Sequence, residues 1–158
     1  MTEALVPDWI KRIKEQRDMD SVTAQVIAQQ QALLAKTIEA DGPTFWRDFL
    51  KDLQITVDSL DFIGLRAQMT EVTSGTSEDG QQILVFNPAL LARQTHTNIF
   101  YGAGATAIRC HPQDKPSYRM EFCLNGRNEL AVSVGARGPM TATEATQYVV
   151  EPMAKTKT

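Results

Sequence analysis

Residues 118–134, YRMEFCLNGRNELAVSV, contain the pattern that decides the fold class. Apolar side chains alternate with polar ones through residues 118–124 and again through residues 130–134. A period of two is typical of a half-buried β-strand, and the turn residues between the two segments join them into an antiparallel hairpin. The hairpin predicts a sheet with one face buried against another layer.

Three segments on the N-terminal side of this hairpin predict further strands. Residues 65–70 alternate in the same way, and residues 82–86 and 95–101 have the composition of strands. Residues 89–93 are ambiguous. Together these segments predict an antiparallel, curved sheet of four or five strands across residues 64–139.

The chain before the sheet predicts about three helices, because its apolar residues recur at helical spacing. Pro7 stands at the first position of a short opening helix. Asp20 or Ser21 has a side chain suited to cap a second helix, and residues 41–44, DGPT, break the chain before a third. Gly64 is placed to end that third helix.

A short closing helix is expected after the sheet, because Thr141 and Glu144 have the spacing of a capping box. A chain of 158 residues is long enough to bury one core of its own. We therefore expect an α+β fold in a single domain. Its parts are a helical part (1–63), an antiparallel sheet (64–139), a closing helix (140–152) and a tail (153–158).

The composition excludes several classes of protein. Hydrophobic residues make up 42% of the chain, charged residues 22%, and the formal net charge is −3, as in ordinary globular proteins. Cations are too dispersed to indicate nucleic-acid binding. No apolar run approaches the roughly 20 residues of a membrane span, and the first residues lack the features of a secretory signal. We expect a cytoplasmic protein without a nucleic-acid or membrane partner.

Residues 98–112, NIFYGAGATAIRCHP, contain glycines whose spacing is similar to that of a cofactor-binding loop. Gly102, Gly104 and Ala107 satisfy a loose form of the dinucleotide-binding fingerprint. That motif needs a helix of several turns after the glycines, and Pro112 follows too soon. The stretch therefore predicts a bend or bulge of the sheet, and no cofactor is expected.

Cys110 and His111 have the side chains of a nucleophile and its base. Adjacent residues of a strand face opposite sides of the sheet, so we expect no direct cooperation between them. Cys110 and Cys123 are the only cysteines, and their number and context favour reduced thiols. The sequence also lacks the ligand spacing of a metal site, so no metal is expected.

The first functional hypothesis is a non-catalytic interaction, assembly or regulatory subunit that associates with a protein partner or with itself. It rests on the apolar face formed by Trp46, Phe49, Leu53 and Val57, since no catalytic constellation is evident. The alternative for this face is the core of the protein, packed against the sheet. On this hypothesis the protein is not an enzyme.

The second hypothesis is a small-molecule pocket, binding or catalytic, between the helices and the curved sheet. A sheet that curves beneath helices encloses space, and ligand pockets need apolar walls with a few polar groups. The candidate lining residues are Tyr101, His111, Tyr118 and Arg119.

Overall fold

The computed structural model describes residues 5–73, 75, 77–89, 94–102 and 104–155. Ala103, part of the ambiguous segment 89–93 and the end of the tail 153–158 lie outside the described residues. The chain divides into two compact units, Met1–Lys36 and Thr37–Thr158, and each is described by itself. The expectation of a single domain stays a prediction.

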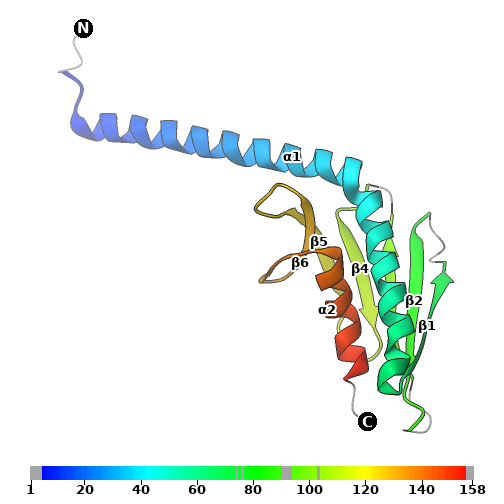
Figure 1. Ribbon diagram of the computed structural model, residues 1–158. Helices are drawn as coiled ribbons and strands as arrows, with labels where there is room; N and C mark the ends of the chain where they lie inside the picture. The colour runs from blue at the N-terminus through cyan, green and yellow to red at the C-terminus, as the bar shows by residue number, and fades with distance from the viewer. Residues whose placement is uncertain (1–4, 74, 76, 90–93, 103, 156–158) are drawn as a thin grey trace. The chain divides into compact units, whose positions relative to one another are not determined.

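Among the described residues, seven strands form one open antiparallel sheet in the second unit (Figure 1). Each strand pairs with its neighbours in the chain, so the order across the sheet is β1 to β7. The α+β class and the antiparallel sheet are confirmed, whereas the expected four or five strands are too few. The strands are β1 (Arg66–Val72), β2 (Asp79–Phe86), β3 (Gln94–Tyr101), β4 (Ala107–Pro112), β5 (Tyr118–Leu124), β6 (Leu130–Val134) and β7 (Arg137–Met140).

The two strands that the sequence pattern does not predict are β4 and β7. Strand β4 lacks simple alternation at its start, because Ala107 and Ile108 are both buried. Strand β7 contains Gly138 and Pro139, residue types that are depleted in strands. It lies at the edge of the sheet, where a proline is tolerated because one side of the strand needs no partner.

One helix of 52 residues, α1 (Asp8–Ser59), replaces the three helices expected for this region. The capping candidates Asp20 and Ser21 lie exposed within it, and so does Pro43, whose missing N–H costs the helix one hydrogen bond. Gly42 serves a packing contact rather than a break. A Cβ atom there would lie 2.8 Å from Tyr101 Oη, so only glycine lets the two groups approach this closely.

The predicted helix ends at Gly64 and Thr141 are confirmed. A 3₁₀ turn, η2 (Leu60–Ile63), follows α1 and ends at Gly64, whose φ of 82° is left-handed. Helix α2 (Ala142–Ala154) begins after Thr141, whose side chain accepts a hydrogen bond from the Glu144 N–H while the Glu144 carboxylate accepts one from the Thr141 N–H. The closing helix therefore runs two residues later than expected at each end.

The core of the second unit lies between the sheet and the helices on one of its faces (Figure 1). The rings of Phe45 and Phe122 meet edge to face at 5.6 Å, and those of Trp46 and Tyr101 lie 5.3 Å apart. Side chains buried almost completely in this core are Phe49, Leu53, Ile83, Ile99, Ile108, Met120, Val132, Met140 and Val150.

Candidate functional site

The helix face considered for a partner is covered by the protein's own sheet. Trp46 and Val57 are 3% and 2% exposed, and Phe49 and Leu53 are fully buried. All four belong to the core, which is the alternative that the sequence left open for this face. A partner protein has no access to them in this structure.

Most of the large apolar side chains that are exposed among the described residues lie on residues 8–36 of α1, called the N-terminal segment from here on; those exposed outside it are Leu5, Ile55, Phe62 and Ile63. Trp9 is 58% exposed, Met19 65% and Val22 60%. Residues 21–35 carry no ionisable side chain. Among the described helices, none has a stretch long and apolar enough to cross a bilayer. The large side chains exposed along this segment include Trp9, Ile10, Ile13, Met19, Val22, Val26 and Ile27.

Of the four residues considered for a pocket, Tyr118 lines the cavity beside α2 described below, and Tyr101, His111 and Arg119 do not line that cavity. Tyr101 is 5% exposed and packs in the core against α1. His111 lies on the other face of the sheet, where its Nδ1 is 2.8 Å from Ser117 Oγ. Arg119 alternates with the buried residues of β5 and is exposed. Strand alternation therefore divides the four candidates between the two faces of the sheet: Tyr101 and Tyr118 lie on the helix-covered face, and His111 and Arg119 lie on the other.

The glycines of residues 98–112 form the turn between β3 and β4. The Ala105 N–H donates to the Gly102 carbonyl at 2.9 Å, and Gly104 has a φ of 77°. Strand β4 begins at Ala107, where a dinucleotide-binding fold has a helix. The change of direction is thus a tight turn between two strands, not a bulge within one.

Cys110 is fully buried on the helix-covered face and lies opposite Tyr118 in the register of β4 and β5. Burial raises the pKa of its thiol to about 12, and the hydrogen bond from Tyr118 offsets only part of this rise. A neutral buried thiol is a poor nucleophile. His111 projects to the opposite face, and both Cys110 and Cys123 are free thiols.

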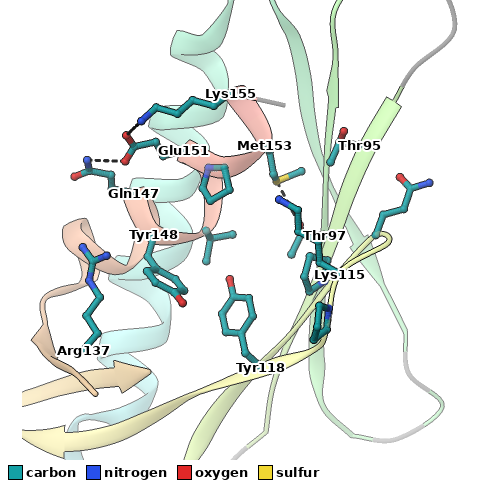
Figure 2. Close-up of a pocket in the computed structure, with 15 residues that line it drawn as sticks. Thr95, Thr97, Lys115, Tyr118, Arg137, Gln147, Tyr148, Glu151, Met153 and Lys155 are labelled. Carbon is teal, nitrogen blue, oxygen red and sulfur yellow. Dashed lines mark hydrogen bonds and ion pairs between the residues drawn. The ribbon is translucent and has the colours of Figure 1, made fainter. Parts of the chain in front are cut away.

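A cavity of about 630 Å³ lies between α2 and the strands β3 to β5 (Figure 2). Thr97 and Met153 are buried at its inner side, where Thr97 Oγ1 donates to Met153 Sδ at 3.3 Å. Tyr118 from β5 and Tyr148 from α2 form a wall, with their rings edge to face at 5.4 Å. Burial raises the pKa of the Tyr118 phenol, so this group stays protonated at neutral pH.

The lining of the cavity is positively charged. Lys115, Arg137 and Lys155 contribute cations, and Glu151 contributes the single carboxylate. Glu151 is engaged within α2: Lys155 Nζ lies 2.6 Å from its carboxylate, and Gln147 donates to it at 2.9 Å. The hydrogen bond from Lys155 is the main cause that lowers the pKa of Glu151. The lining therefore carries a net charge of +2 in a chain whose net charge is −3.

Sequence reasoning missed most residues of this cavity. Arg137 lies in the unpredicted strand β7, with its guanidinium 5.2 Å from the centre of the Tyr148 ring. Tyr148 falls within the expected closing helix, but nothing in the local sequence says over which strands that helix lies. The only available signal was the strand alternation of β5, which places Tyr118 on the same face as Met120 and Phe122.

No family model, curated protein or solved structure matches the chain. Within the part of the chain that the structure describes, no group of three or more His, Cys, Asp or Glu side chains is arranged to hold a metal ion.

Proposed function

We propose that the protein is a non-catalytic assembly subunit that self-associates through the N-terminal segment. The observation that carries this proposal is the row of large apolar side chains exposed between Trp9 and Ile27. An isolated helix is marginally stable in water and normally gains its stability from the packing of an apolar face. Burying one Val or Ile side chain contributes about 1.5–3 kcal/mol, so several of them supply a substantial driving force for association.

A second copy of the same helix fits this segment. Ile13, Asp20, Ile27 and Leu34 recur every seven residues and so occupy one of the two seam positions of a heptad repeat. The other seam position is polar and carries Gln16, Thr23 and Gln30. Residues 21–35 carry no charge that pairing would have to desolvate. Gln30 and the neighbouring glutamines have amides that both donate and accept, so they are suited to hydrogen bonds between two identical helices.

Asp20 favours an antiparallel pair. In a parallel, in-register pair, each seam residue faces its own counterpart, so Asp20 would lie against Asp20 of the partner subunit. Two carboxylates at one seam position repel each other, and one polar seam residue is sufficient to select orientation. An antiparallel pair separates the two carboxylates along the helix, because the two copies run in opposite directions.

Substitution within the seam tests self-association. We expect the wild-type chain to be a dimer at micromolar concentration, and Ile27→Lys to raise the dimer dissociation constant at least about a hundredfold, since two seam positions are lost per dimer. Ile55→Lys is the matched control, because Ile55 is 56% exposed on α1 outside the N-terminal segment. Analytical ultracentrifugation measures both constants. A wild-type chain that stays monomeric at high micromolar concentration would overturn the proposal.

Cross-linking tests the orientation separately. In a Cys123→Ser background, Ile13→Cys and Leu34→Cys place thiols near opposite ends of the segment. For an antiparallel pair we expect a short bismaleimide to join the two variants when they are mixed, but not to join two copies of Ile13→Cys. Efficient joining of Ile13→Cys to itself would show a parallel pair and contradict the role given to Asp20. The cytoplasmic location remains part of this proposal.

A further inference from the structure

The cavity beside α2 has the size and walls of a small-molecule site. Its volume of about 630 Å³ falls inside the range of roughly 300–1,000 Å³ typical of pockets for organic ligands. Tyr118, Tyr148 and Met153 present apolar surface to it, from both the sheet and the helix (Figure 2). A ligand that buries itself against these side chains needs an apolar body.

The positive charge of the cavity lining indicates which polar group the ligand carries besides its apolar body. Lys155 forms the ion pair with Glu151, whereas Lys115 and Arg137 form no ion pair among the described residues. The Arg137 guanidinium lies over the Tyr148 ring, near enough to Glu151 to contribute to lowering the pKa of its carboxyl. Lys115 and Arg137 are both exposed at the edge of the cavity. Arg137 presents a planar fork of N–H donors, which matches a carboxylate better than a spherical anion.

We propose that this cavity binds an amphipathic organic carboxylate, with the apolar body against the wall formed by Tyr118 and Tyr148 and the carboxylate at Arg137 or Lys115, the two cations on either side of that wall (Figure 2). The residues involved all belong to the second compact unit. The site is therefore independent of self-association through the N-terminal segment, and the two proposals fail or succeed separately.

A matched pair of probes tests the site on the full chain. Dansylaminoundecanoic acid has a fluorescent apolar body and a carboxylate, and its methyl ester has the same body without the charge. We expect the acid to bind at least about tenfold more tightly than the ester, since a hydrogen bond to a charged group contributes about 1.5–3 kcal/mol. The double variant Lys115→Gln/Arg137→Gln should remove this difference while leaving the binding of the ester unchanged.

The control removes the same charge elsewhere. Arg47→Gln/Lys51→Gln neutralises two exposed cations on α1 and should bind the acid as the wild type does. Exposed substitutions of this kind usually change stability by less than about 0.5 kcal/mol, and a melting curve checks each variant. If a variant unfolds, the salt dependence of the wild type decides: the affinity for the acid should fall with salt and that for the ester should not.

Three results would overturn the proposal. The first is equal affinity of the wild type for the acid and the ester. The second is an equal loss of affinity for the acid in the pocket variant and in the α1 control. The third is probe binding that Ile27→Lys abolishes and the pocket variant leaves unchanged, because this would locate the probe on the N-terminal segment.

Discussion

Replacing Phe49 by alanine should destabilise the protein strongly. The Phe49 side chain is fully buried, and its ring lies 6.0 Å from that of Trp46. Truncation of a buried Phe removes its transfer free energy and leaves a cavity, which together cost about 3–5 kcal/mol. Because domains of this kind are stable by about 5–15 kcal/mol, the change takes away a large part of the free energy of unfolding.

Guanidinium unfolding followed by tryptophan fluorescence measures this loss. The chain has two tryptophans, and Trp9 is already 58% exposed, so the emission shift on unfolding comes mainly from Trp46 at 3% exposed. Ile55→Ala is the control, because Ile55 lies six residues further along the same helix and is 56% exposed. We expect its free energy of unfolding to stay within about 0.5 kcal/mol of the wild type.

The refuting result is specific. If Phe49→Ala lost less than about 1 kcal/mol and instead dissociated an oligomer, Phe49 would be part of an interface between proteins and not of the core. That outcome would instead support the hypothesis drawn from the sequence, in which a protein partner binds the face formed by Trp46, Phe49, Leu53 and Val57. Equal losses for Phe49→Ala and Ile55→Ala would also refute the assigned burial.

Two further predictions concern the end of the chain and its buried thiol. Thr141→Ala removes the capping box of α2 and should lower the free energy of unfolding by about 1 kcal/mol. Thr143→Ala, two residues further on, removes only an exposed hydrogen bond of 3.0 Å to Asp52 and should cost less; urea titration compares the two variants. Burial raises the pKa of Cys110 from its ordinary value of 9.0 to about 12, so the folded protein keeps a proton that the unfolded chain loses. Stability from this group is therefore complete below about pH 9 and disappears as pH rises toward 12, and Cys110→Ala should flatten that decline; unchanged steepness in the variant would contradict the assignment.

The hairpin of β5 and β6 shows what local sequence determines well. Alternation over two strands and a short turn suffices to predict which residues face the core, and Phe122 indeed lies opposite Val132 in the register. Gly64 and Thr141 were predictable for the same reason, because helix ends depend on residues within one turn. These features require no knowledge of distant contacts.

The continuity of α1 and the position of the cavity depend on distant contacts instead. From the local sequence, Gly42 indicates the end of a helix. In the structure the helix continues through Gly42, and the absence of a side chain there lets Tyr101, which is far along the chain, pack against it. Apolar residues recur at helical spacing both near Phe49 and near Ile27, so the sequence alone does not distinguish the two faces. In the structure the sheet covers Phe49, whereas Ile27 is exposed. Likewise, strand alternation places Tyr118 on the helix-covered face of the sheet, but it does not predict that Tyr148 of α2 packs against Tyr118.

The order of elements along the chain has a consequence for the synthesis of the protein. Phe49 and its buried neighbours on α1 leave the ribosome before any strand of the sheet that covers them. About 80 residues separate Val57 from the end of β7, so at roughly 5–20 residues per second the complete sheet is synthesised about 4–17 seconds after the apolar face of α1. During that interval the nascent chain presents Trp46 and Phe49 to water, and chaperones that recognise apolar helices have their best opportunity to bind it.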